Sequence, residues 1–133
     1  LPICRQAESN PIERLVGVMS GEEILEMQRA VRRVRVDDLL VDYLMEIVSA
    51  TRGSEVLDLG VSPRGSLALF QAAQALAFIE ERDYCIVDDI KRLVIPVFSH
   101  RLAMSPRYVS RGGGRDDTER VLAEILEAIP VPL

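Results

Sequence analysis

The sequence of 133 residues contains no tryptophan, two cysteines and one histidine. Cys4 and Cys85 are too few for a disulfide scaffold, and His100 alone excludes most histidine-based metal sites. The three tyrosines are too scattered to form a platform on which nucleic-acid bases would stack. We therefore expect no metal site, no catalytic residue in this chain, and a reducing, cytoplasmic compartment.

Long hydrophobic runs are also missing from the sequence. No apolar stretch is long enough to span a bilayer, and there is no signal peptide. The net charge of −5 argues against a domain that coats nucleic acid. We predict no membrane partner and no nucleic-acid partner. Because the first residue is Leu, we also expect the sequence to be part of a longer protein.

The residues that are present favour helices. Hydrophobic residues make up 48% of the chain and recur at helical spacing, which predicts an all-α bundle of about five helices. The predicted helices cover residues 21–33, 38–51, 63–81, 87–102 and 117–128. We expect one short β-bridge between residues 34–36 and 84–86, and a loop over residues 54–61.

The same pattern divides the chain into segments. We predict a lead-in over residues 1–19, whose apolar side chains pack on the surface, and a helical domain over 20–110. A flexible glycine-rich loop is expected over 111–116, followed by a C-terminal helix and tail over 117–133. Gly53 is expected to end the second helix in a left-handed conformation, and Pro96 to kink or interrupt the fourth.

The predicted third helix carries the most informative local signal. It is apolar on nearly all sides, which predicts a central helix buried by several neighbours. Ser62 is a good N-cap, and Pro63 suits the first helical position. Arg64 then lies in the first turn, where the helix dipole is positive. This position indicates either an anion site, with phosphate the usual ligand, or a structural arginine paired with a carboxylate.

Several stretches of the sequence, in the right order, resemble the MoxR-type AAA+ ATPases. Residues 59–69 resemble the family's "lGaSPRaslaL" signature. Further resemblances are residues 26–34 to its first lid helix, 50–52 to its "aTR", 81–90 to its "GRDYVTPEDV", and 96–102 to its "pVlrHRl". The resemblance covers residues 20–133, and the ordered set is more specific than any single motif.

Two departures from the family pattern affect helix starts. Ile86 and Val87 stand where the family has a Thr-Pro helix start, so Asp89 is expected to cap the fourth helix instead. Gly65 replaces a common alanine, which we expect to loosen the turn beside Arg64.

The resemblance implies a C-terminal lid domain whose ATPase core lies outside this chain. Arg64 would be the sensor-2 arginine that reaches the β- and γ-phosphates of ATP, at the helix start formed by Ser62 and Pro63. ATP and Mg²⁺ would be bound mainly by the core, so the parent would be an ATP hydrolase and this chain alone would not be catalytic. Family members form rings, commonly hexamers, and act as chaperone-like remodellers, often with von Willebrand factor A domain proteins. The implied partners are therefore the chain's own AAA+ core, neighbouring ring subunits and such proteins.

A free-standing helical protein-interaction or DNA-binding module is the alternative. It would use the helix that begins at Pro63 to read DNA, but the acidic net charge and the apolar character of that helix oppose this. Arg52 and Arg101 either contact a neighbouring subunit or pair with acids of this chain, and we expect the second.

Overall fold

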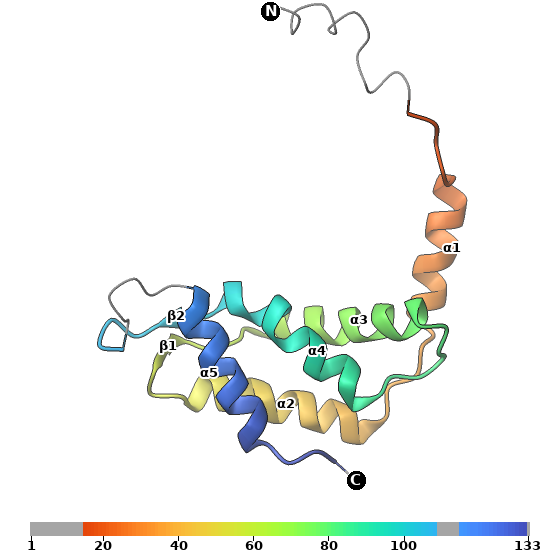
Figure 1. Cartoon of the computed structure of the whole chain (residues 1–133). Helices are drawn as coiled ribbons and strands as arrows, with labels where there is room; N and C mark the ends of the chain where they lie inside the picture. Colours follow the sequence, from red (N-terminus) through yellow and green to blue (C-terminus); the bar gives the residue numbers. More distant parts are fainter. Residues whose placement is uncertain (1–14, 109–114, 133) are drawn as a thin grey trace, which may run out of the picture.

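The computed structural model describes residues 15–108 and 115–132. The elements in order are α1 (Gly21–Val31), α2 (Asp38–Gly53), β1 (Leu57–Leu59), α3 (Pro63–Ile79), α4 (Val87–Phe98), the 3-10 turn η3 (Ser99–Arg101), β2 (Ala103–Met104) and α5 (Arg115–Ala128). Figure 1 shows that α2, α3, α4 and α5 form one body and that α1 projects from it. The predicted all-α bundle of about five helices is thus confirmed.

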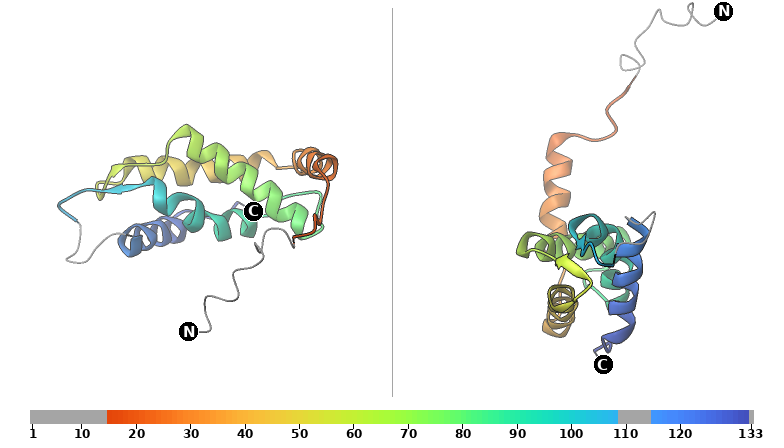
Figure 2. Two further views of the ribbon diagram at one scale, coloured as in Figure 1. Left: turned by 90° about the horizontal axis from the view of Figure 1, so that it is seen from above. Right: turned by 90° about the vertical axis from the view of Figure 1, so that its left-hand side faces the viewer.

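The body consists of α2, α3, α4 and α5, and α1 is attached to its edge. Helix α3 packs against α4 and α2, while α5 crosses α2 and α4. Helix α1 contacts α3, and in the left view of Figure 2 it is seen end-on while α3 lies lengthwise. It begins with the predicted capping box, in which Ser20 and Glu23 bond each other's backbone N–H groups at 3.2 and 2.6 Å.

The hydrophobic core lies between the four helices of the body. Its side chains recur every three or four residues along each helix, so each helix turns one apolar face inward. The cluster contains Val34, Leu40, Tyr43, Leu44, Ile47, Val48, Val61, Leu69, Ala73, Ala77, Cys85, Ile90, Val94, Phe98 and Leu122. Because Leu122 belongs to α5, the C-terminal helix shares this core.

The segment between α1 and α2 is tied to the segment between α3 and α4. Arg35 and Tyr84 form a parallel β-bridge, as predicted. The Arg35 N–H donates to the Asp83 carbonyl at 2.9 Å, and the Cys85 N–H donates to the Arg35 carbonyl at 2.9 Å. These contacts hold the two connections at one end of the body.

The predicted loop over residues 54–61 is wrong in part, because it contains a strand. β1 pairs with β2 in an antiparallel sheet, with Leu57 opposite Met104 and Leu59 opposite Ala103. The Ser105 N–H extends the pairing by donating to the Val56 carbonyl at 2.9 Å. The partner strand lies more than 40 residues away in sequence, so local pattern does not reveal it.

The left-handed cap predicted at Gly53 and the interruption predicted at Pro96 do not occur. Helix α2 ends at Gly53, as expected, but Ser54 follows it in an extended conformation. The left-handed residue found instead is Glu81, with φ of 59°, just after α3. Helix α4 continues through Pro96 to Phe98, and η3 then extends it, so the proline does not interrupt the helix.

Two further predictions about burial are wrong. Helix α3 is not buried on all sides, because Leu67 and Ile79 are 55% and 74% exposed. In the lead-in, Leu15, Val16 and Val18 are exposed rather than packed on the domain. All these apolar side chains lack a covering neighbour among the described residues.

The expected flexible loop over 111–116 lies mostly outside the described residues, as does most of the lead-in. The last two residues of the expected loop, Arg115 and Asp116, belong to α5, so this helix starts earlier than predicted. Asp116 and Asp117 lie in its first turn, where acidic groups favour a helix start. Within residues 15–108 and 115–132, no helix is long and apolar enough to cross a membrane.

Candidate functional site

The start of α3 is anchored to the end of α2 through Val61. The Val61 N–H donates to the Thr51 hydroxyl at 3.1 Å, and that hydroxyl donates to the Val48 carbonyl at 2.7 Å. The next residue of α2, Arg52, donates from Nε to the Val61 carbonyl at 2.8 Å. Thr51 is fully buried, so these bonds are shielded from water. Two adjacent residues of α2 therefore hold both polar groups of the Val61 backbone.

Gly60 allows this close approach of two backbones. A Cβ atom at position 60 would lie 2.8 Å from the Arg52 Cα atom and 2.8 Å from the Thr51 carbonyl oxygen. Backbone atoms cannot move aside as a flexible side chain can. Only glycine fits here, which explains in physical terms why Gly60 precedes the helix start.

The predicted cap of α3 is confirmed. The Gly65 N–H donates to the Ser62 hydroxyl at 3.3 Å, and Pro63 occupies the first helical position. The Ser66 N–H donates to the Ser62 carbonyl at 3.1 Å. The first turn of α3 is therefore fully formed, and its free N–H groups lie at a fixed position.

Gly65, which we expected to loosen this turn, is buried against Val61. A Cβ atom at position 65 would lie 2.7 Å from Val61 Cγ1 and 3.6 Å from Arg101 Cδ. The family signature has alanine at both 61 and 65. Here the larger Val61 and the smaller Gly65 fill the same space.

Arg64 projects from the first turn of α3 into solvent. Its side chain is exposed, and no carboxylate or other polar group among the described residues pairs with it. The alternative of a structural arginine paired with an acid therefore has no support in residues 15–108 and 115–132. The positive end of α3 and an unpaired guanidinium lie together.

Arg52 and Arg101 flank the same turn. Arg101 donates from Nε to the Val97 carbonyl at 2.9 Å, much as Arg52 donates to Val61. The ion pairs with acids that we predicted for the two arginines are not found among the described residues, where both bond backbone carbonyls instead. Each arginine donates from Nε only, and its two other guanidinium nitrogens have no partner in the described part of the chain. Arginines from α2, α3 and η3 thus gather at one helix start, although the chain is acidic overall.

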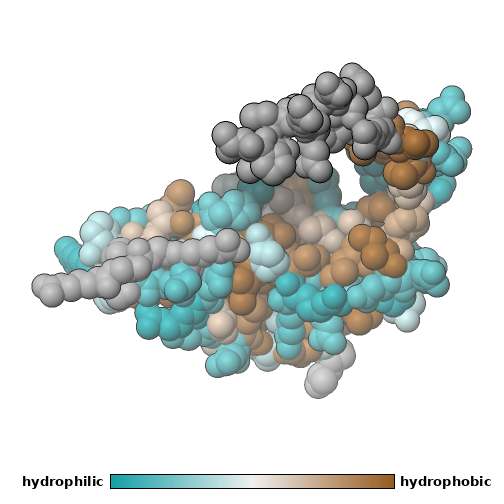
Figure 3. Space-filling view, turned by 45° about the horizontal axis from the view of Figure 1, so that its top comes forward, coloured by the Kyte–Doolittle hydropathy of each residue, from teal (hydrophilic) through white to brown (hydrophobic). Residues whose placement is uncertain are grey.

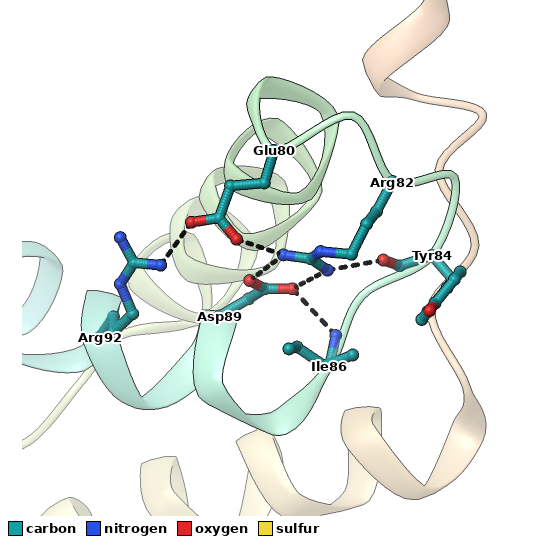
Figure 4. Close-up of polar contacts among 6 residues, drawn as sticks. All are labelled: Glu80, Arg82, Tyr84, Ile86, Asp89 and Arg92. Carbon is teal, nitrogen blue, oxygen red and sulfur yellow. Dashed lines mark hydrogen bonds and ion pairs between the residues drawn. The ribbon is translucent and has the colours of Figure 1, made fainter.

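A second polar cluster stabilises the turn between α3 and α4 (Figure 4). Arg82 donates to both carboxylate oxygens of the buried Asp89, at 2.6 and 2.8 Å, and also to the Tyr84 carbonyl at 2.9 Å. Asp89 in turn accepts from the Ile86 N–H at 2.9 Å, so it caps α4 as predicted. Sequence reasoning missed Arg82 as its partner, since a run of charges usually indicates a solvated surface.

Glu80 completes this cluster from the end of α3. It accepts from Arg82 at 2.8 Å and from Arg92 of α4. The hydrogen bonds from Arg82 and then from Arg92 hold the pKa of Glu80 below its usual range. The cluster lies at the end of α3 opposite Arg64, so it positions the helix rather than contacting the same ligand.

The described residues do not form a metal site. Among residues 15–108 and 115–132, no three His, Cys, Asp or Glu side chains are grouped to hold a metal ion. His100 is exposed on η3. The start of α3 brings helix N–H groups and arginines together, a combination that favours an anion.

Comparison with known proteins assigns the fold. The sequence profile of the AAA lid domain matches residues 49–125, which include the Thr51–Arg64 segment and α4. The chain belongs to the AAA lid domain family. This agrees with the resemblance to MoxR-type AAA+ ATPases found in the sequence.

Individual relatives of the lid support the same assignment. It is 42% identical over 128 residues to the uncharacterised protein YeaC of Bacillus subtilis, covering 96% of this chain and 39% of YeaC. It is 30% identical over 124 residues to the chaperone MoxR1 of Mycobacterium tuberculosis, covering 86% of this chain and 32% of MoxR1. The lid thus spans about a third to two fifths of these relatives.

A solved structure has the same fold as the lid. A crystal structure of a candidate ATPase from Cytophaga hutchinsonii matches with a TM-score of 0.79 and 22% identity. The match covers 98% of this chain and 42% of the solved chain. At this identity the match speaks for the arrangement of the helices, including α1, rather than for a shared site.

Proposed function

We propose that the chain is the C-terminal lid of a MoxR-type AAA+ ATPase and that Arg64 senses the phosphates of ATP. The observation that carries the proposal is Arg64 itself, exposed and unpaired among the described residues at the capped start of α3. Guanidinium groups and helix N-termini both attract phosphate oxygens. ATP and Mg²⁺ are bound mainly by the core of the parent, which supplies the groups for hydrolysis.

The anchored surroundings of Arg64 suit a sensor. Thr51 and Arg52 fix Val61, Ser62 caps the helix, and Pro63 sets the direction of the chain before Arg64. Arg64 is therefore attached to a rigid element, so a force on its guanidinium moves the whole lid. When the γ-phosphate is lost, the attraction falls and the lid swings relative to the core.

The proposal extends to a wider role that the family resemblance suggests. A lid that moves with the nucleotide state couples hydrolysis in a cytoplasmic ring of subunits to chaperone-like remodelling of other proteins, including von Willebrand factor A domain proteins. Arg52 and Arg101 each keep unbonded guanidinium nitrogens and are available to the same nucleotide or to a neighbouring subunit. The DNA-binding alternative gains no support, since α3 buries Leu69, Ala73 and Ala77 and exposes apolar side chains.

The test is ATP turnover by the full-length parent carrying Arg64→Ala. We expect ATP to bind and the turnover number to fall by roughly a thousandfold, the lower end of the range for arginines that stabilise phosphoryl transfer. Arg107→Ala is the matched control, because it also removes one exposed arginine but lies in the turn after β2. Wild-type turnover in the Arg64 variant would reject the proposal.

A further inference from the structure

A hydrophobic groove of about 410 Å³ lies between α1 and α3. Its apolar wall consists of Ile24, Met27 and Val31 from α1 and of Phe78 and Ile79 from α3. Figure 3 shows hydrophobic side chains gathered where α1 meets the body of the molecule. Apolar positions on two crossing helices form the kind of groove that accepts one face of an amphipathic helix.

Helix α1 is under-packed for a helix of its length. It has 11 residues, none of them buried, and Ile24, Leu25 and Met27 are 43%, 51% and 38% exposed. Isolated helices shorter than about 12–15 residues are marginal in water and depend on tertiary packing. Among the described residues its packing partner is α3, on one side only. The exposed side therefore requires a cover.

The charge beside the groove restricts the chemistry of that cover. Arg32 lines the groove and is exposed. It is not paired with an acid in residues 15–108 or 115–132. A segment that lies in the groove gains by carrying acidic residues beside its apolar face.

The lengths of the relatives indicate where such a segment comes from. The matched stretch is 39% of YeaC and 32% of MoxR1. The fold of 98% of this chain, α1 included, recurs within a solved chain of which it makes up 42%. Proteins with this lid therefore carry a further part that is longer than the lid itself.

We propose that the α1–α3 groove binds an acidic, amphipathic segment of the same AAA+ polypeptide, from the part outside this chain. The proposal rests on the chain being the lid of a longer protein, and not on the role of Arg64. In the parent, α1 is then buried between the lid and the rest of the polypeptide. It would set the resting position from which the lid swings.

The test compares two engineered thiols in the full-length parent. Met27→Cys places a thiol in the groove, and Met45→Cys places one on the outer face of α2; the native methionines are 38% and 43% exposed. Cys4→Ser removes one native thiol, and burial raises the pKa of the Cys85 thiol to about 11, so Cys85 reacts slowly. Peptide mass spectrometry measures the rate at which maleimide labels each engineered thiol. As a control, the two thiols should be labelled at equal rates in urea.

We expect the thiol of the Met27→Cys variant to be labelled at least about tenfold more slowly than that of Met45→Cys, since a covered thiol reacts only on local opening. Ile24→Cys, at a residue 43% exposed in this chain, repeats the test should the first variant fail to fold. Equal rates would overturn the proposal. If the groove thiol loses its protection from maleimide when the protein is diluted to monomers, the groove binds a second copy of the chain. If the thiol is protected only when a partner protein is added, the groove binds that partner. Either result would overturn the proposal.

Failure of the sensor proposal gives a different result. The labelling contrast between positions 27 and 45 is expected to persist without nucleotide and in the Arg64→Ala background. Turnover in that background and labelling in the groove therefore report on separate claims.

Discussion

The hydroxyl of Thr51 accepts a hydrogen bond from the Val61 N–H at 3.1 Å and so joins the end of α2 to the start of α3. Thr51→Val keeps the shape of the side chain but leaves the buried Val61 N–H without its acceptor. We expect a loss of about 1–3 kcal/mol in the free energy of unfolding, the cost of one unsatisfied buried polar group. Urea denaturation measures it. Thr51→Ser, which retains the hydroxyl, is expected to lose less, and equal stability of Thr51→Val and wild type would contradict the assignment.

Val61 and Gly65 share one space, and this predicts non-additive substitutions. Gly65→Ala alone introduces a Cβ atom 2.7 Å from Val61 Cγ1. Alanine favours a helix by up to about 1 kcal/mol over glycine, yet we expect a net loss of stability because Val61 is buried and branched. In the double variant Val61→Ala/Gly65→Ala, which restores the family pattern, the second substitution is expected to stabilise. A double-mutant cycle by thermal denaturation tests this, and additive effects would contradict it.

The pair of Arg82 and Asp89 is expected to matter more for stability than the exposed pair of Arg35 and Asp83. The side chains of the first pair are 18% and 1% exposed, and those of the second are 74% and 80% exposed. Arg82→Met leaves a buried carboxylate without its counter-charge, whereas Arg35→Met removes a solvated contact. Thermal midpoints are expected to fall clearly for the first variant and little for the second. Equal midpoints would show that the cluster in Figure 4 is not stabilising.

Glu80 predicts part of the acid sensitivity of the fold. Its pKa is lowered in the folded state, mainly by the hydrogen bond from Arg82, from an ordinary value of 4.5. Its contribution to stability is therefore present above pH 4.5 and is lost as the pH falls through the lower folded-state pKa. We expect Glu80→Gln to be less stable than wild type at pH 7, with the difference shrinking toward pH 3. Urea midpoints across this range measure it, and a constant difference would contradict the assignment.

The sequence predicted the helices well where caps and periodicity are local. Ser20 with Glu23, and Ser62 with Pro63, marked helix starts that the structure confirms. The strand at Leu57 was not predictable because its partner lies near Ala103, and no turn signal joins them.

Other differences between the predictions and the structure depend on packing between helices. Pro96 is a poor helix residue, but the packed face of α4 outweighs its intrinsic preference. The apolar pattern of α3 did not tell which of its faces are packed within this chain. Leu67 and Ile79 are exposed, whereas Leu69, Ala73 and Ala77 are buried.

The construction of the candidate site was predicted only in part, and its chemistry stays a prediction. The cap and the unusual position of Arg64 followed from the order of Ser62, Pro63 and Arg64. The backbone anchors made by Arg52 and Arg101 did not, because arginine–carbonyl bonds depend on which carbonyls tertiary structure leaves free.

Relative affinity for ATP and ADP tests the central claim most directly. A sensor of the γ-phosphate must bind one nucleotide state better than the other. In the full-length parent, isothermal titration should show that Arg64→Ala narrows the ratio of the ADP and ATP dissociation constants by about tenfold, equivalent to roughly 1.4 kcal/mol. The Arg107→Ala control should leave the ratio unchanged. An unchanged ratio in the Arg64 variant would contradict the assignment of Arg64 as the nucleotide sensor.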